Sequence, residues 1–228
     1  RLYVIGGYTK SGLSVWNPEA TVYAYDPATD RWTERASMPT ARGALSVTEH
    51  EGKLYAIGGY DRKANTSAVE VYDPARNVWT TGASLPTPRD HLATATVAGK
   101  LYAIGGRIDG DYSRNLAVVE RYDLPTDRWT RVSNLPTARS GITTAVAEGV
   151  IYVMGGEGSD GTFNRNEAYD PVGDRWQGMA PLPTARHGLG SAVIQDRIYV
   201  ISGGPTPGGS FSDLNEVFIP PRGNAKAD

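Results

Sequence analysis

The chain carries the same short apolar run five times, at nearly constant intervals. Each run has four hydrophobic residues and ends at a pair of glycines, as in LYVIGG, LYAIGG and IYVMGG. A short apolar run bounded by turn residues predicts a β-strand that is covered on both faces. The successive glycine pairs lie 52, 47, 50 and 48 residues apart, at Gly6-Gly7, Gly58-Gly59, Gly105-Gly106, Gly155-Gly156 and Gly203-Gly204.

Two further markers follow the glycine pairs with the same period. They are a tryptophan and a Pro-Thr turn that ends in arginine, and both step by 47, 50 and 47 residues. Agreement among three separate markers indicates a repeated structural unit. The tryptophans are Trp32, Trp79, Trp129 and Trp176, and the turns end at Arg42, Arg89, Arg139 and Arg186.

Each repeat contains four predicted strands, which we label a to d. In the third complete repeat they cover 141–147, 151–156, 166–171 and 175–180. Between strands c and d, Pro171 fixes φ and Gly173 supplies a permissive position, as a tight turn requires. One sheet of such short strands cannot bury both of its own faces. It must stack against copies of itself, and a ring of blades satisfies that requirement.

These features resemble the Kelch family. The resemblance rests on the IYVMGG run, the spaced tryptophans and a Tyr-Asp-Pro triplet at 25–27, 72–74 and 169–171. It implies an all-β fold, a Kelch-type β-propeller of four-stranded blades. Two copies depart from the triplet: the third reads Tyr122-Asp123-Leu124, and the fifth reads Val217-Phe218-Ile219 with no tryptophan after it.

The resemblance covers residues 1–219 and predicts five repeats. We place the units at about 1–42, 43–89, 90–139, 140–186 and 187–219, with a polar tail over 220–228. The first unit lacks strand a and the last lacks strand d, which leaves 18 strands. We expect either that roughly 20–25 residues precede Arg1 in a five-bladed ring, or that the parent ring has six blades, a common size in this family. In both cases we expect exposed strand edges at the seam, through which the protein can self-associate.

The composition excludes several classes of partner and cofactor. Lys and Arg number 23 against 25 Asp and Glu, for a net charge of −2, and no basic stretch stands out, so we expect no nucleic-acid partner. No segment approaches the roughly 20 apolar residues of a membrane span, so we expect no membrane insertion. The chain has no cysteine, which removes disulfides and thiolate metal sites but leaves the compartment open. We expect no cofactor.

Residues that recur in every blade are interpreted as structural. The glycine pairs do not open a helix in a phosphate-binding pattern, so we interpret them as points of close backbone approach. Equivalent glutamates point in different directions around a ring and cannot pair for catalysis, so we expect them to be solvated or bonded to backbone. The glutamates are Glu70, Glu120, Glu167 and Glu216, and the tyrosines expected to pack between blades are Tyr3, Tyr55, Tyr102, Tyr152 and Tyr199.

The repeated arginines allow two interpretations. Arg42, Arg89, Arg139 and Arg186 each begin the innermost strand, so we expect them to ring one mouth of the central channel. They either bond loop carbonyls and shape the crossover between blades, or form a positive funnel for carboxylate or phosphate groups. In the Kelch family the b–c loops and the crossovers share one face, which commonly captures partners. Adaptors that recruit acidic peptides use arginines at positions that resemble Arg139.

The b–c loops differ from repeat to repeat, which makes them the predicted place for specificity. Trp16 lies outside the repeated tryptophan position, and it is either a plug against its own blade or an anchor for a partner. The other candidates on the same face are Tyr60, Arg62, Arg107 and Tyr112.

The favoured function is a non-catalytic scaffold that binds a protein, an acidic peptide or a carbohydrate. A copper site with a cysteine-crosslinked tyrosine, as in galactose-oxidase-like Kelch enzymes, is excluded because there is no cysteine, and His50, His91 and His187 do not have metal-site spacing. A sialic-acid-type mutarotase or epimerase remains an alternative, with His91, His187 or Glu157 as the acid or base. A structural module without a dedicated ligand is a further alternative.

Overall fold

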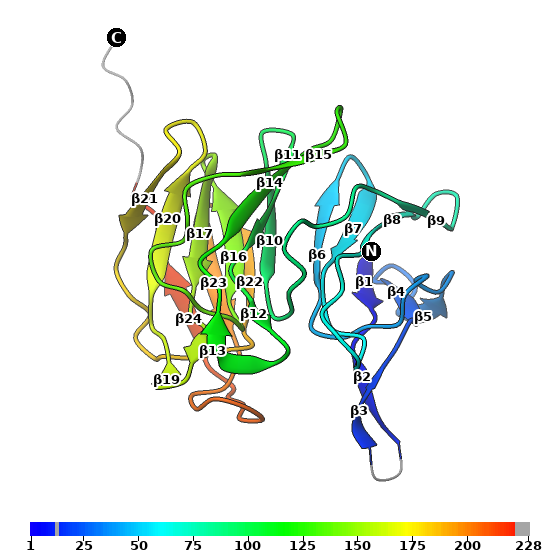
Figure 1. Cartoon of the computed structure of the whole chain (residues 1–228), viewed down its shortest axis with the longest axis horizontal. Helices are drawn as coiled ribbons and strands as arrows, with labels where there is room; N and C mark the ends of the chain where they lie inside the picture. Colours follow the sequence, from blue (N-terminus) through cyan, green and yellow to red (C-terminus); the bar gives the residue numbers. More distant parts are fainter. Residues whose placement is uncertain (12–13, 222–228) are drawn as a thin grey trace.

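The computed structural model describes residues 1–11 and 14–221, and its strands form five small antiparallel sheets and three hairpins (Figure 1). Blade 1 contains β1 (Leu2–Ile5), β4 (Val22–Asp26) and β5 (Arg31–Glu34); blade 2 contains β6 (Ser46–His50), β7 (Lys53–Ile57), β8 (Val69–Asp73) and β9 (Val78–Thr81); blade 3 contains β10 (Ala93–Val97), β11 (Lys100–Ile104), β14 (Val119–Asp123) and β15 (Arg128–Arg131). Blade 4 contains β16 (Thr143–Ala147), β17 (Val150–Met154), β20 (Asn166–Asp170) and β21 (Arg175–Gly178), and blade 5 contains β22 (Gly190–Ile194), β23 (Arg197–Ile201) and β24 (Asn215–Phe218).

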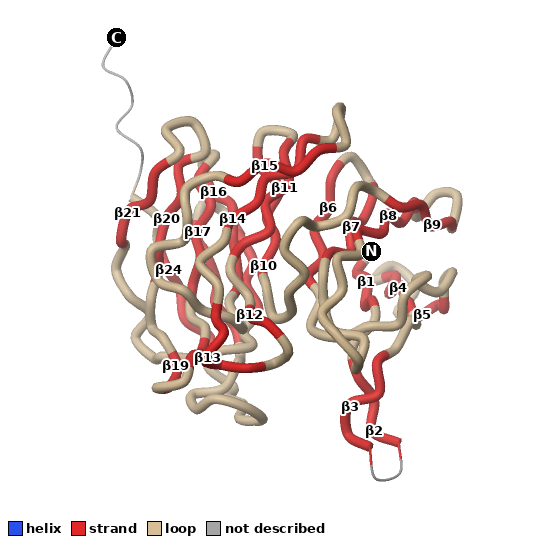
Figure 2. The backbone as a smooth tube through the Cα atoms, in the orientation of Figure 1, coloured by secondary structure: helices blue, strands red, loops and turns tan. Residues whose placement is uncertain are grey.

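The predicted all-β propeller is confirmed. Every blade keeps its strands in chain order, and the first and last blades have three strands, as the repeat pattern predicted. The described part of the chain is all strand and loop, and it has no helix long and apolar enough to span a membrane (Figure 2). Of the predicted tail over 220–228, residues 222–228 lie outside the described residues.

Three hairpins project from the b–c loops. They are β2 (Tyr8–Ser11) with β3 (Ser14–Pro18), β12 (Arg107–Ile108) with β13 (Asp111–Asn115), and β18 (Glu157–Gly158) with β19 (Gly161–Thr162). The labels of β2, β3, β13 and β19 lie at the lower side of the molecule in Figure 1. The variable loops therefore share one face, which we call the loop face.

The innermost strands β6, β10, β16 and β22 lie side by side around the channel. Hydroxyl groups join them across the blades, because each strand exposes small Ser and Thr side chains toward its neighbour. The oxygen atoms Oγ of Ser46 and Oγ1 of Thr94 lie 2.8 Å apart, as do those of Thr143 and Ser191. These contacts satisfy the polar groups of strands that approach one another too closely for large side chains.

The four repeated arginines are buried inside the blades rather than exposed around the channel mouth. Arg42, for example, is fully buried, and its Nη1 donates to Glu70 Oε2 at 2.5 Å while Nη2 donates to the carbonyl of Ala56 at 3.0 Å. Thr40 donates to the other glutamate oxygen at 2.7 Å, so the crossover clamps strand c of the next blade. The same ion pair recurs as Arg89–Glu120, Arg139–Glu167 and Arg186–Glu216, at 2.5–2.6 Å.

This geometry corrects two expectations. The arginines do not form a positive funnel, since each guanidinium is neutralised by a carboxylate and has no exposed surface. The strand-c glutamates are neither solvated nor bonded mainly to backbone, since each is the partner of a repeated arginine. The sequence left two interpretations open for the arginines and did not pair them with the glutamates, because the two residues lie 28–31 positions apart and meet only when the blade folds.

Tyrosine and tryptophan side chains connect blades 2, 3 and 4 each to the blade before it. Trp79 Nε1 donates to the carbonyl of Ala36 at 2.8 Å, and Asn77 Oδ1 accepts from the amide of Ala36 at 2.9 Å and from the hydroxyl of Tyr72 at 2.6 Å. We call this set a latch, because it holds both polar groups of one residue in the preceding blade. It recurs as Trp129, Asp127 and Tyr122 around Ala83, and as Trp176, Asp174 and Tyr169 around Ser133.

The glycine pairs allow close backbone approach, as predicted, but the fifth pair is out of register. Gly58 has φ of +65°, and a Cβ built on it would lie 2.8 Å from the carbonyl oxygen of Arg89. In blade 5 the two equivalent residues are Ser202 and Gly203, with φ of +58° and +85°. Gly204 then occupies the next repeat position, so the true step from the fourth pair is 47 residues rather than 48.

The outer faces of the two terminal blades are exposed. Val4 on β1 is 48% exposed, whereas its equivalent Ala103 in blade 3 is fully buried. Val217 on β24 is also 48% exposed, whereas its equivalent Ala168 is 4% exposed. Trp32, at the latch position of blade 1, is 52% exposed, so the described blades leave it largely uncovered.

Replacing Asp127 with alanine is expected to lower the urea midpoint of unfolding by more than its control, because the Tyr122 hydroxyl and the Ala83 amide lose their shared acceptor. The matched control is Asp30→Ala, since Asp30 accepts only from Tyr25 on the exposed face of blade 1. Urea unfolding of both variants checks the latch. Equal losses would contradict a stabilising contact between blades.

Replacing Arg139 with methionine is expected to cost about 3–5 kcal/mol of stability, because it leaves the carboxylate of Glu167 buried without its cation. Adding Glu167→Met should recover most of the loss. The control Arg175→Met removes an exposed ion pair with Asp170, which is expected to contribute at most about 1 kcal/mol. A loss for Arg139→Met no larger than for Arg175→Met would refute the structural role.

Candidate functional site

A pocket of about 770 Å³ opens on the loop face. It brings together residues from the b–c loops and from the crossovers of successive blades. Its rim is mainly aromatic and its floor is charged. The rim contains Tyr8, Trp16, Tyr60, Arg62 and Tyr112, and the floor contains Asp90, His91, Arg107, Glu157 and His187.

Two repeat positions supply most of the floor. One follows the second glycine of each pair, and the other follows the repeated arginine. Isolated antiparallel bridges pair these positions in four blades, so their side chains come from fixed points of the backbone. The bridges join Gly43 with Tyr60, Asp90 with Arg107, Ser140 with Glu157, and His187 with Gly204.

The residue after each crossover position has a left-handed backbone conformation. His91 has φ of +50°, and Gly141 and Gly188 have +62° and +60°. This conformation favours glycine, so a histidine there is held by the surrounding structure. A Cβ built on Gly141 would lie 3.3 Å from both the Glu157 carboxylate and His187, so glycine leaves room for those two side chains.

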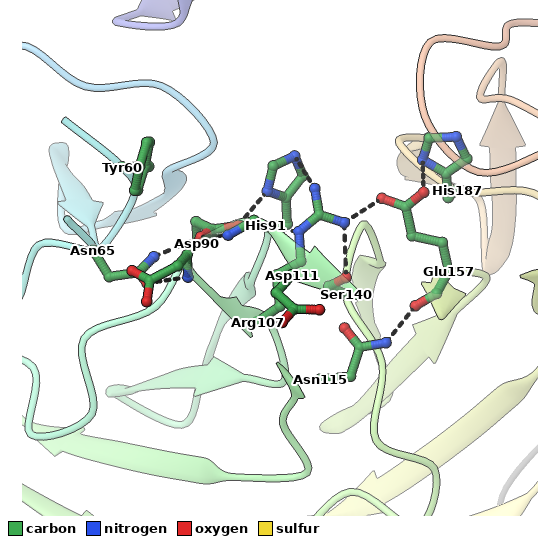
Figure 3. A network of polar contacts seen from close by, with 12 residues as sticks. Tyr60, Asn65, Asp90, His91, Arg107, Asp111, Asn115, Ser140, Glu157 and His187 are labelled. Atoms are coloured by element: carbon green, nitrogen blue, oxygen red, sulfur yellow. Dashed lines mark hydrogen bonds and ion pairs between the residues drawn. The ribbon is translucent and has the colours of Figure 1, made fainter. Parts of the chain in front are cut away.

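Arg107 lies at the centre of the floor network (Figure 3). It is 5% exposed, and its Nη1 donates to Glu157 Oε1 at 2.7 Å and to Ser140 Oγ at 3.3 Å. Its Nε lies 3.3 Å from Asp90 Oδ1, and the ring of Tyr112 covers the guanidinium at 4.5 Å. Arg107 is therefore neutralised by two buried carboxylates and shielded from solvent by an aromatic face.

The first floor pair is Asp90 with His91. Nδ1 of His91 lies 2.5 Å from Asp90 Oδ1, and Nη2 of Arg107 donates to His91 Nε2 at 3.1 Å. A guanidinium can only donate, so Nε2 is the acceptor of the contact with Arg107. Burial raises the pKa of Asp90, but the hydrogen bond and charge of His91, followed by the hydrogen bond from Asn65, outweigh it and hold the pKa below its ordinary value.

The second floor pair is Glu157 with His187. His187 Nδ1 lies 3.1 Å from Glu157 Oε2, and both side chains are almost fully buried. Burial raises the pKa of Glu157, but the hydrogen bond and charge of His187, followed by those of Arg107, outweigh it and keep the carboxyl ionised. The floor thus pairs its cationic and anionic groups internally.

The rim is aromatic and only partly buried. Trp16 is 63% exposed and contacts Tyr8 edge to face, with ring centroids 5.5 Å apart. Burial, with the nearby charge of Asp90, raises the pKa of Tyr8 to about 12, so its hydroxyl stays protonated and donates to the carbonyl of Tyr60 at 3.3 Å. Arg62 is exposed and donates to Asn17 Oδ1 at 2.9 Å, which joins the loops of blades 1 and 2.

The structure gathers the five loop candidates and separates them from the four repeated arginines. The pocket is lined by all five loop candidates, Trp16, Tyr60, Arg62, Arg107 and Tyr112. The blades bury the four repeated arginines, Arg42, Arg89, Arg139 and Arg186. Trp16 contacts the neighbouring Tyr8 and keeps most of its surface free for a partner.

Tyr8 and Asp90 line the pocket but were not among the site residues predicted from the sequence. The signal was present in the repeats. The residue directly after each glycine pair or repeated arginine varies, although the marker beside it recurs. A variable position inside a constant frame is where a repeat protein places specificity.

The described residues contain no group of three or more His, Cys, Asp or Glu side chains arranged to hold a metal ion. The floor carboxylates and histidines are instead occupied by one another and by Arg107. The ring nitrogens of His91 and His187, residues proposed for a mutarotase, contact Asp90, Arg107 and the carbonyl of Thr206, and the mutarotase alternative stays a prediction.

The blade architecture and the loop-face pocket define a Kelch-type β-propeller. The model of the KLHDC2/KLHL20/DRC7 Kelch-repeats domain matches residues 1–204 of the chain. The chain therefore belongs to the Kelch-repeat family.

Curated relatives match over shorter segments. Kelch-like protein 28 of Homo sapiens is 38% identical over 64 residues, which is 27% of this chain and 11% of that protein. Kelch-like protein 5 of Homo sapiens is 50% identical over 48 residues, 21% of this chain and 6% of that protein. Beta-scruin of Limulus polyphemus is 38% identical over 63 residues, 28% of this chain and 6% of that protein. The chain thus covers only 6–11% of the length of these relatives.

Proposed function

We propose that this propeller is a binding scaffold that holds an exposed segment of another protein in the loop-face pocket. The observation that carries the proposal is the aromatic rim, which combines side chains from three blades around one opening. Tyr8 and Trp16 come from blade 1, Tyr60 from blade 2 and Tyr112 from blade 3. Exposed aromatic side chains beside a pocket are typical anchors of protein interfaces.

The charge of the pocket favours a partner segment with an apolar side chain next to a single acidic group. Arg107 and the floor carboxylates neutralise one another, so the floor offers little free charge. Arg62 at the rim is exposed and has no carboxylate partner among the described contacts. An acidic residue of the partner can therefore reach Arg62, whereas it cannot reach the four buried arginines. Protein ligands are favoured over carbohydrates because Kelch propellers typically act as protein-interaction scaffolds.

The test is a peptide-display selection on the purified chain, followed by affinity measurements with the selected peptides. Trp16→Ala is expected to weaken binding by about thirtyfold, because it removes an aromatic anchor. Arg62→Glu should weaken acidic peptides by about tenfold and abolish their salt dependence. Lys63→Glu is the matched control, since Lys63 is the exposed neighbour outside the pocket.

Unchanged affinity in both Trp16→Ala and Arg62→Glu would overturn the pocket as the binding site. Acidic sugars are measured in the same assay with the same variants. Binding of a sugar that depends on Trp16 and Arg62, with no peptide selected, would replace the protein ligand by a carbohydrate.

Self-association through the open blade edges stays a prediction. The exposed apolar residues on β1 and β24 support it, because equivalent positions in inner blades are covered by a neighbouring sheet. Sedimentation velocity over a concentration series tests it, with Val217→Lys as the variant that should shift the equilibrium toward monomer. A monomer at all concentrations would contradict it.

A further inference from the structure

A second hollow lies beside the pocket, between two of the hairpins on the loop face. Strand β13 of blade 3 contacts strand β18 of blade 4, and the labels of β13 and β19 lie next to each other in Figure 1. The hollow between the two hairpins has a volume of about 320 Å³. We call it the hairpin cleft, and its lining includes Tyr112, Ser113, Asn115, Gly158, Asp160 and Phe163.

The hairpin cleft adjoins the pocket through Tyr112, which lines both hollows. An extended peptide segment advances by about 3.3 Å per residue, and its side chains point alternately to opposite sides. A partner segment that packs on Tyr112 in the pocket therefore reaches the hairpin cleft within a few residues.

Hydrogen bonds hold the walls of the hairpin cleft in place. Nδ2 of Asn115 in β13 donates to the carbonyl of Glu157 in β18 at 2.8 Å, which joins the two hairpins. Thr162 Oγ1 in β19 donates to the carbonyl of Pro205 at 2.8 Å, which joins the second of these hairpins to blade 5. Because the walls are fixed before a ligand arrives, less ordering is needed on binding.

The polar groups of the hairpin cleft leave negative charge uncompensated. The exposed carboxylate of Asp160 accepts from Ser159 Oγ at 3.2 Å, and within residues 1–11 and 14–221 it forms no ion pair. Arg114, the neighbour of Asn115 in β13, pairs with Asp109 at 2.7 Å instead. The lining of the cleft contains no Lys or Arg, so Asp160 is open to a cation from outside.

The amide of Asn115 adds to this negative character. Its Nδ2 must face the carbonyl of Glu157, because only the nitrogen end of the amide can donate. The other end, Oδ1, is buried and has no hydrogen-bond partner in the described part of the chain. An unpaired acceptor of this kind favours a cation nearby over an anion.

Two aromatic side chains also line the hairpin cleft. Phe163 is half-buried, and a Cβ built on Gly158 would lie 3.2 Å from its ring, so glycine gives Phe163 room beside β18. Tyr112 bounds the cleft on the side of the pocket. Aromatic rings suit the aliphatic stems and the charged heads of lysine and arginine.

We propose that the hairpin cleft receives a lysine or arginine side chain of the partner segment that is held in the pocket. This inference rests on the binding function proposed above and adds a second charge to the partner. The stem of the basic side chain packs against Tyr112 and Phe163, and its charged head pairs with Asp160. Arg62 belongs to the b–c loop of blade 2 and Asp160 to that of blade 4, so the partner carries its acidic and basic groups on opposite sides of its apolar anchor.

Peptide display on the wild type and on Asp160→Lys tests the charge preference of the hairpin cleft. Peptides selected on the wild type are expected to carry Lys or Arg on one side of the apolar anchor and Asp or Glu on the other. On Asp160→Lys the basic residue should be replaced by an acidic one, because a reversed wall charge reverses the preference. Wild-type peptides without an enriched basic residue, or the same enrichment on both proteins, would overturn the proposal.

Affinity measurements with one selected peptide then test the pairing with Asp160. Replacing the basic residue of the peptide with alanine should weaken binding to the wild type by about fivefold, but binding to Asp160→Asn by only about twofold. The control is Asp213→Asn, which should behave as wild type, because Asp213 is exposed in the b–c loop of blade 5 and lines neither hollow. Equal losses for the wild type and Asp160→Asn would refute the pairing.

The subsite and the binding function fail in different ways. Peptides whose affinity depends on Trp16 and not on Asp160 would remove the subsite and leave the pocket as the binding site. Selection of no peptide at all would overturn both. Asp160 lies in an exposed hairpin turn, so both of its variants are expected to keep the urea midpoint of the wild type.

Discussion

The stacking of sheets on one another is the constraint on which the whole structure depends. Each blade is apolar on both faces, so a blade is stable only when a neighbour covers it. The latches serve this stacking, because a tryptophan and an acidic or amide side chain hold both polar groups of one residue in the preceding blade. The exposed valines of the terminal blades and the exposed Trp32 mark the faces that none of the described blades covers.

The buried Arg–Glu pairs make each crossover rigid. A guanidinium sealed inside a blade is costly unless a carboxylate and backbone carbonyls surround it, and here the repeat that follows each arginine supplies the carboxylate and at least one carbonyl, as Glu70 and Ala56 do for Arg42. The pair binds the crossover to strand c, and the glycine pair brings strand b close to the same crossover. The backbone on the loop face is therefore held in the same position in every blade, and the two residues beside these anchors are free to vary.

The pocket arises from that variation. The frame places the residues beside these anchors around the axis. The position after the glycine pair holds a tyrosine in blades 1 and 2, Arg107 in blade 3 and Glu157 in blade 4, and the position after the repeated arginine adds Asp90 and His187. The charged residues neutralise one another through Arg107, which leaves the aromatic rim and Arg62 to meet a partner. His187 belongs to this network through Glu157 and also contacts the carbonyl of Thr206, which follows the last glycine pair.

The repeat in the sequence was sufficient to predict the blades, the order of their strands and the incomplete first and last sheets, because strand patterns and turns are local properties of the chain. It also indicated the loop face, since the b–c loops vary while the markers do not. Only the tertiary structure decided three other features. Arg42 pairs with Glu70, Ser202 and Gly203 take the positions of the fifth glycine pair, and Arg107 meets Glu157. Those contacts join residues from different strands or different blades, and no local pattern specifies which of several arginines is buried in an ion pair and which is left at a rim.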